Sequence, residues 1–184
     1  MPRYLLLSLL VVAAPTLAAA DEALWELLRG GGQVVLIRHA VTTPGVGDPP
    51  GFRLNECATQ RNLTDAGRED ARRVGATFRA RSIPVGRVLS SPWCRCLETA
   101  RLAFGGAEVW TPLSNLFDNR AREPEQMRAL REIAGRRPTG GNLLLITHGS
   151  VVLPLTGIQP APAELVVLTP EAVDRFRVAG RLTP

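Results

Sequence analysis

Two uninterrupted apolar runs, residues 34–37 and 143–146, limit the possible folds of this chain more than any other feature. Neither run alternates with polar residues, so each is typical of a strand covered on both faces. Helical patterns separate these strands along the chain, and that alternation indicates a mostly parallel sheet between helices. We therefore expect an α/β fold, a three-layer α/β/α sandwich with a mostly parallel central sheet.

Caps and turn residues place the other elements. Thr64 can cap a helix that begins at Asp65. Ser91 followed by Pro92 predicts the start of another helix, with Ser91 as its N-cap, after a strand over 85–91. The remaining expected elements are a helix within 21–29, a short strand near 107–110, a helix opened by Pro124, and a strand hairpin of 163–170 and 174–182 at a sheet edge.

The first twenty residues have the layout of a secretory signal peptide. Arg3 precedes an apolar stretch, and small residues lead to Asp21, so we expect cleavage after Ala20. The alternative is an uncleaved N-terminal anchor. Residues 21–184 are then a single domain in the periplasm or outside the cell, without a stable membrane anchor after cleavage.

Three cysteines would enter an oxidising compartment if the chain is exported. A bridge between Cys94 and Cys96 would be strained at that spacing, so we expect Cys57 to pair with one of them. Three buried free thiols are the alternative. Two histidines and no Cys-x-x-Cys motif give little support for a zinc site, and we expect neither a metal nor another cofactor.

The basic residues are all arginine, and the formal net charge is +5. They are dispersed along helices without a basic run, and the chain has one tyrosine. This pattern attracts anions in general but lacks the basic patch and stacking aromatics of a nucleic-acid binder. We expect a small anionic partner, and the oligomeric state cannot be read from the sequence.

Both histidines of the chain, His39 and His148, directly follow the predicted ends of apolar strands. Ligands of such sheets gather at the carboxyl ends of the strands, where we expect these side chains to meet. Arg38 and Arg95 would join them, Arg95 from the first turn of a helix. A helix N-terminus favours an anion, and the planar guanidinium group can donate two hydrogen bonds to phosphate oxygens. The sequence therefore predicts a phosphate site.

A neutral imidazole can attack phosphorus and carry the phosphoryl group, and His39 is the expected nucleophile. Arg38, Arg95 and His148 would bind and stabilise the charged oxygens, and Thr42 could add a hydroxyl donor. The leaving oxygen needs a proton. The candidates for this general acid, in order, are Asp118, Glu123 and Glu98.

Three motifs together, "RHA" at 38–40, "SSPWCRCLETA" at 90–100 and "THGS" at 147–150, resemble the histidine phosphatase superfamily, the phosphoglycerate mutase-like proteins. "RNLTDAGREDA" at 61–71 resembles the family segment that leads into its first long helix. The resemblance implies a phosphoglycerate mutase-like fold, with the phosphorylated histidine at His39, phosphate-binding arginines at Arg38 and Arg95, and the second histidine at His148.

This chain departs from the family pattern in several places. Ala40 replaces the usual glycine, Thr42 stands where serine is common, and Gly45 stands where many members have asparagine. The cap insertions and His-Asp pair of the acid phosphatase branch are absent, which indicates the small branch.

Export favours a phosphomonoesterase over a mutase, because a glycolytic mutase needs cytosolic substrates. A sugar phosphate of lipopolysaccharide core is one candidate substrate. The alternatives are a phosphate-binding protein without turnover and a phosphohistidine-protein phosphatase. Residues 41–62 form a long loop, either a lid over the site or a structural loop.

Overall fold

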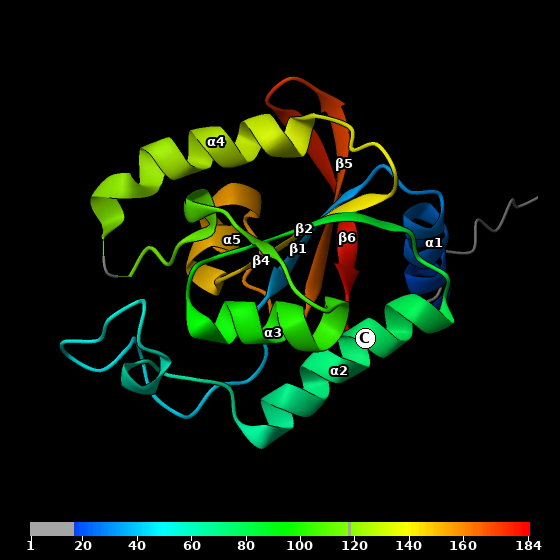
Figure 1. The fold of residues 1–184 in the computed structure, drawn as a ribbon. Coiled ribbons are helices and arrows are strands. Elements are labelled where there is room, and N and C mark those ends of the chain that lie inside the picture. The colour runs from blue at the N-terminus through cyan, green and yellow to red at the C-terminus, as the bar shows by residue number, and fades with distance from the viewer. Residues whose placement is uncertain (1–16, 118) are drawn as a thin grey trace, which may run out of the picture.

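The computed structural model describes residues 17–117 and 119–184, whose centre is a six-stranded sheet (Figure 1). The strands follow the order β3-β2-β4-β1-β5-β6. The first four are parallel, and β5 and β6 form an antiparallel hairpin at one edge. The mostly parallel sheet and the edge hairpin are therefore confirmed. The strands are β1 (Val34–Arg38), β2 (Val85–Ser90), β3 (Glu108–Val109), β4 (Asn142–Thr147), β5 (Leu165–Ala172) and β6 (Arg175–Leu182).

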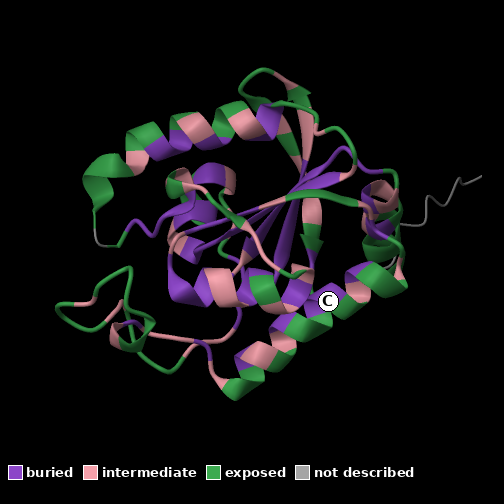
Figure 2. Ribbon diagram, viewed as in Figure 1, coloured by how far each residue is buried: buried purple, intermediate pink, exposed green. Residues whose placement is uncertain are grey.

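Helices cover both faces of the sheet, which confirms the three-layer sandwich (Figure 2). Alternate residues of β1 point to opposite cores: Val35 and Ile37 to one, Val34 and Leu36 to the other. The first core packs against α1 (Leu17–Arg29), α2 (Asp65–Ala80) and α3 (Cys94–Phe104), and the second against α4 (Glu123–Gly135) and α5 (Gly149–Thr156).

The predicted cap fixes the start of α2, because the Thr64 hydroxyl accepts a hydrogen bond from the Gly67 N–H at 3.0 Å. Two glycines let this helix approach its neighbours closely. A Cβ at Gly75 would lie 2.0 Å from the Ala103 carbonyl oxygen on α3, and one at Gly67 would lie 2.0 Å from the carbonyl oxygen of Val41. A side chain at either position would therefore push α2 away from the segments that carry the site.

Three local expectations need correction. The N-cap of α3 is Trp93, without a side-chain hydrogen bond, so Ser91 does not cap this helix. Helix α1 begins at Leu17, before the expected start at Asp21. Helix α5 was not predicted at all, because it is one short apolar segment that contains Pro154, a residue that removes a helical hydrogen bond.

The predicted signal peptide falls mainly on residues 1–16, which lie outside the described ranges. Its last four residues, 17–20, form the first turn of α1. Among the described helices, none has the length and apolar character needed to cross a membrane.

Candidate active site

Register places the two histidines at one edge of the sheet. Arg38 on β1 pairs with Thr147 on β4, so His39 and His148 follow on neighbouring parallel strands. The His39 N–H donates to the Thr147 carbonyl at 2.9 Å, and the two imidazole centroids lie 5.3 Å apart. Both side chains are almost completely buried. The predicted meeting of the two histidines is confirmed.

The hydrogen bond of His39 defines which of its ring nitrogens can react. Its Nδ1 lies 2.8 Å from the Ala40 carbonyl oxygen, which can only accept, so Nδ1 carries the proton. The pKa of His39 is lowered to about 3, mainly by burial and also by the charges of Arg95, Arg38 and Arg61, while the hydrogen bond to Ala40 acts in the opposite direction. The ring is therefore neutral near pH 7, with an unprotonated Nε2 available as a nucleophile.

His148 is held by side chains that follow β2. Its Nε2 lies 2.8 Å from the Ser91 hydroxyl and 3.5 Å from the Cys96 Sγ, and the Trp93 ring packs edge-on against it. Burial lowers the pKa of His148 well below its usual value, and His39 and the arginines add to that effect. A hydroxyl that donates to Nε2 leaves a proton on Nδ1, so His148 can act as a neutral hydrogen-bond donor.

A cavity of about 360 Å³ opens at this edge and is lined by both histidines and by Arg38, Arg61 and Arg95. In each of the three arginines, Nη1 donates a hydrogen bond within the protein. The acceptors are the Pro160 carbonyl for Arg38 at 2.7 Å, the Gly45 carbonyl for Arg61 at 2.6 Å, and the Asp48 carboxylate for Arg95 at 2.7 Å.

The Nε atoms of the same three arginines are buried and have no hydrogen-bond partner within the described ranges. Buried donors without partners are costly, and guanidinium groups form charge-assisted hydrogen bonds with oxyanions. Burial lowers the pKa of Arg38, and the charge of Arg61 adds to this effect. Burial and Arg95 likewise lower the pKa of Arg61. The cavity thus has the electrostatics of an anion site.

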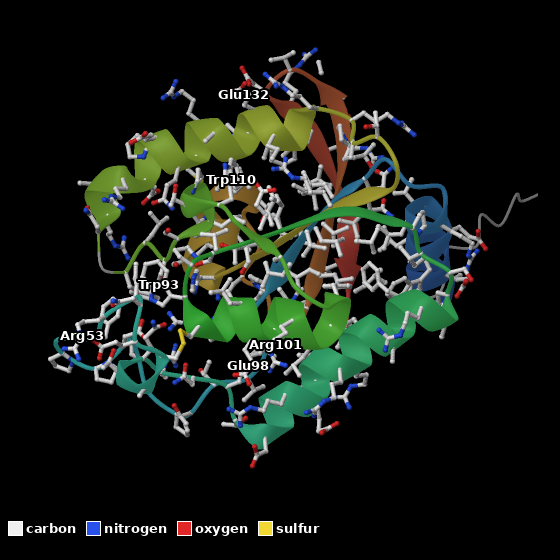
Figure 3. All side chains as sticks on the ribbon, in the orientation of Figure 1. Arg53, Trp93, Glu98, Arg101, Trp110 and Glu132 are labelled. Carbon is white, nitrogen blue, oxygen red and sulfur yellow. A yellow bond between two sulfur atoms is a disulfide. The ribbon has the colours of Figure 1, made fainter. Side chains whose placement is uncertain are left out.

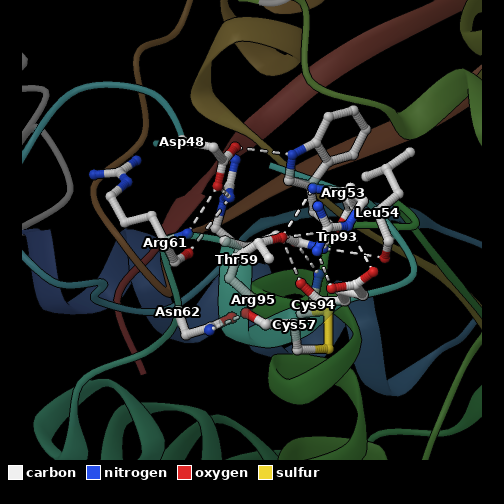
Figure 4. Close-up of a disulfide and its surroundings, with 12 residues drawn as sticks. Asp48, Arg53, Leu54, Cys57, Thr59, Arg61, Asn62, Trp93, Cys94 and Arg95 are labelled. Atoms are coloured by element: carbon white, nitrogen blue, oxygen red, sulfur yellow. Dashed lines mark hydrogen bonds and ion pairs between the residues drawn. A yellow bond between two sulfur atoms is a disulfide. The ribbon is translucent and has the colours of Figure 1, made fainter. Parts of the chain in front are cut away.

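Asp48 holds Arg95 from the side of the long loop (Figure 4). Its Oδ1 accepts from Arg95 at 2.7 Å and from the Arg61 N–H at 2.9 Å, and its Oδ2 accepts from the Trp93 indole at 2.9 Å. Burial alone would raise the pKa of Asp48, but the hydrogen bonds from Arg95 and the Arg61 backbone outweigh it, and the pKa lies below its usual value. Asp48 is therefore a carboxylate that orients Arg95.

A disulfide joins the same loop to the first residue of α3. Cys57 pairs with Cys94, one of the two expected pairings, and Cys96 is a buried free thiol. The Gln60 side chain also accepts from the Cys94 N–H at 3.0 Å, which caps α3. Residues 41–62 are thus attached to the N-terminus of α3 by a covalent bond, a cap and an ion pair.

The other predicted site residues differ in whether they line the cavity. Thr42 forms an isolated bridge with Leu63 and does not line the cavity. Glu98 lies between α3 and α2, where it pairs with Arg68 at 2.9 Å, away from the cavity (Figure 3). Glu123, the first residue of α4, lines the cavity. Asp118 lies outside the described residues.

Sequence reasoning missed Asp48, Gln60 and Arg61. Arg61 opens the "RNLTDAG" segment, four residues before α2 begins at Asp65, and that position was the available signal. Asp48 and Gln60 lie in an irregular loop without a motif, and nothing in the sequence links them to α3. In the described ranges, no three side chains of the metal-ligating types gather in one place.

The family model of the histidine phosphatase superfamily (branch 1) matches residues 34–123 of this chain. That match covers the first two motifs and ends at Glu123. The third motif, with His148, lies beyond it, and the pairing of β1 with β4 brings it to the same site. No curated protein matches the chain in sequence.

Several solved structures share this phosphoglycerate mutase-like fold. The Rv3214 protein from Mycobacterium tuberculosis is 18% identical, with a TM-score of 0.56 over 80% of this chain and 96% of that one. The protein histidine phosphatase SixA complexed with tungstate is 20% identical, with a TM-score of 0.56 over 83% and 97%. The SixA protein from Agrobacterium tumefaciens is 22% identical, with a TM-score of 0.53 over 84% and 99%. At these identities the similarity shows the fold alone.

Proposed function

We propose that this protein is an exported phosphomonoesterase that works through a phosphohistidine on His39. The observation that carries the proposal is the neutral His39, whose proton lies on Nδ1, in a cavity lined by Arg38, Arg61 and Arg95; the Nε atoms of these arginines have no partner among the described residues. A tetrahedral phosphoryl group would satisfy these donors while it faces the nucleophile. A protein histidine phosphatase of the same fold forms a complex with tungstate, another oxyanion.

The first half-reaction moves the phosphoryl group to the enzyme. His39 Nε2 bonds to phosphorus as the bond from phosphorus to the substrate oxygen breaks, and a general acid protonates that oxygen. Arg38, Arg61, Arg95 and His148 spread the charge of the equatorial oxygens, since phosphoryl transfer depends mainly on positioning and electrostatics. Water then attacks the phosphohistidine, returns a proton to the acid and releases phosphate, so that neutral His39 is regenerated.

Glu123 is the proposed general acid. Of the carboxylates within 17–117 and 119–184, it is the one that lines the cavity. Asp118, the first candidate from the sequence, remains the alternative and lies outside the described residues. The arginines supply the positive charge that a metal ion supplies in other phosphatases, so we expect turnover without added metal.

Export to the periplasm or the medium is part of the proposal. The signal-like segment supports it, and so does the Cys57–Cys94 disulfide, because such bonds persist in oxidising compartments. An exported enzyme does not meet the cytosolic phosphoglycerates of glycolysis, so hydrolysis of a phosphomonoester fits export better than a mutase reaction does. Lipopolysaccharide-core sugar phosphates are a candidate substrate that rests on the family resemblance alone.

Hydrolysis of p-nitrophenyl phosphate by residues 21–184, without added metal, is the direct test. We expect turnover that His39→Ala abolishes, and a rapidly quenched reaction should contain an acid-labile, alkali-stable phosphoprotein. His39→Ala should still bind orthovanadate, because the arginines remain. Vanadate binding without turnover in the unaltered protein would contradict the phosphatase and leave a phosphate-binding protein.

A further inference from the structure

The cavity that contains the phosphate centre also has an apolar wall. Phe117 and Leu153 line it, as do Leu116 and Pro154. Phe117 is 58% exposed and Leu153 is 44% exposed, although both are large and apolar. Leaving such side chains in water at the mouth of a site is unfavourable unless a ligand covers them. The phosphate chemistry described above does not use this wall.

Hydrogen bonds fix the wall beside the histidines. Ser150, in the first turn of α5 directly after His148 and Gly149, donates to the Asn115 side chain at 2.7 Å and accepts from the Leu116 N–H at 3.3 Å. The Phe117 N–H is bonded to the same Asn115 oxygen at 3.2 Å. The segment that carries Phe117 is therefore attached to the helix that carries Leu153.

Buried Gln126 on α4 holds this segment from its other side. Its side-chain amide donates to the carbonyls of Pro112 and Ser114 at 3.0 and 2.9 Å. Because the segment is held by both α4 and α5, the backbone that carries Phe117 keeps a defined position relative to the phosphate centre. This makes the wall part of a built site rather than a loose surface patch.

We propose that this wall binds the leaving group, and that the substrate class is the phosphomonoester of an aryl or alkyl alcohol rather than of a polyhydroxylated sugar. The assignment of substrate class depends on the proposed phosphatase function. An apolar group next to the phosphate would cover Phe117 and Leu153 and remove their surface from water. A sugar would place hydroxyl groups against two side chains that offer them no hydrogen bonds.

Binding of two phosphonates tests the wall without any turnover. Methylphosphonate reaches only the phosphate centre, whereas benzylphosphonate also reaches the wall. We expect benzylphosphonate to bind about tenfold more tightly by isothermal titration calorimetry, since one apolar contact in a pocket changes affinity by about that factor or more. Phe117→Ala and Leu153→Ala should each reduce this preference to threefold or less and leave methylphosphonate binding unchanged.

Val173→Ala is the matched control, because Val173 is 67% exposed and lies outside the cavity. It should leave the tenfold preference intact. Equal binding of the two phosphonates, or a preference that survives both wall variants, would overturn the proposed wall.

Turnover separates this proposal from the phosphatase itself. We expect kcat/KM for phenyl phosphate to exceed that for glucose 6-phosphate, and Phe117→Ala to reduce the difference. Equal turnover of the two substrates would overturn the substrate class and leave the phosphatase standing. If no substrate is turned over but the preference for benzylphosphonate is retained, the proposed phosphatase activity is contradicted and the apolar ligand site is supported.

Discussion

Asp48 and Arg95 form an ion pair in which both side chains are almost completely inaccessible, 0% and 1% exposed. The pair joins the loop of residues 41–62 to the first turn of α3, and the Nε of Arg95 has no hydrogen-bond partner among the described residues. Most surface ion pairs contribute little to stability, but a buried pair that loses one partner leaves an uncompensated charge. The position of Arg95 therefore depends on a residue that does not line the cavity.

Asp48→Asn should impair both stability and turnover. We expect the free energy of unfolding to fall by about 3–5 kcal/mol, because Arg95 would be buried without its counter-charge. We expect kcat/KM to fall by about ten- to a hundredfold, because Arg95 would no longer be held in place. Urea unfolding and p-nitrophenyl phosphate kinetics measure the two effects.

Glu56→Gln is the control for Asp48→Asn. It breaks the Arg53–Glu56 pair in the same loop, but those side chains are 58% and 46% exposed. We expect a stability loss below about 1 kcal/mol and unchanged kinetics. Similar losses in both variants would mean that general loosening of the loop, and not the hold on Arg95, explains the Asp48 result.

Reduction of the Cys57–Cys94 disulfide should weaken the same connection. The bond closes a sequence separation of 37 residues, for which loop entropy predicts a stabilisation of about 4 kcal/mol. We expect Cys57→Ser to lower the unfolding midpoint and to raise KM, because residues 41–62 also carry Asp48 and Arg61. Dithiothreitol should reproduce the change in the unaltered protein and have no further effect on Cys57→Ser. A reduced protein with unchanged KM would contradict the role of the bond in the site.

The sequence predicted the helices and strands whose signals are local. From these strands it also predicted the edge of the sheet at which the two histidines meet. Apolar runs identified β1 and β4, and His39 and His148 lie at their ends because parallel neighbours align those ends. Asp48 could not be found in this way, because its partners Trp93 and Arg95 lie more than forty residues away in the chain. Ser91 was read as a helix cap, although its hydroxyl contacts His148 instead. A local cap signal thus concealed a long-range contact.

Both histidines should stay neutral well below the usual pKa of the side chain. Burial lowers the pKa of His39 to about 3, and it lowers that of His148 as well. Because the chain has two histidines, imidazole NMR resonances report the site directly. We expect the His39 chemical shifts to remain constant from pH 8 to about pH 4.5, with its proton on Nδ1, and we expect no titration of His148 near its usual pKa. A titration midpoint near 6.5 for either ring would contradict the buried neutral site.

The same shifts predict how stability depends on pH. An unfolded histidine binds a proton near pH 6.5, whereas the folded ring does not until about pH 3 for His39, so the unfolded state binds more protons between these values. Stability should therefore fall as the pH falls from 6.5 to 5, by about 1.4 kcal/mol per pH unit for each ring once it is fully protonated in the unfolded chain. Urea unfolding across this range measures the slope, and His39→Gln should roughly halve it.

Glu123→Gln should reveal whether this residue protonates the leaving group. A general acid typically contributes about 10²–10⁴-fold, and alcohols of high pKa need its proton most. We therefore expect kcat/KM for an alkyl phosphate to fall by at least a hundredfold, and that for p-nitrophenyl phosphate by less than tenfold. Glu125→Gln alters the other acidic residue in the first turn of α4, which does not line the cavity, and should change neither value. If both substrates lose activity equally in Glu123→Gln, Glu123 is not the acid, and the same comparison on Asp118→Asn tests the alternative.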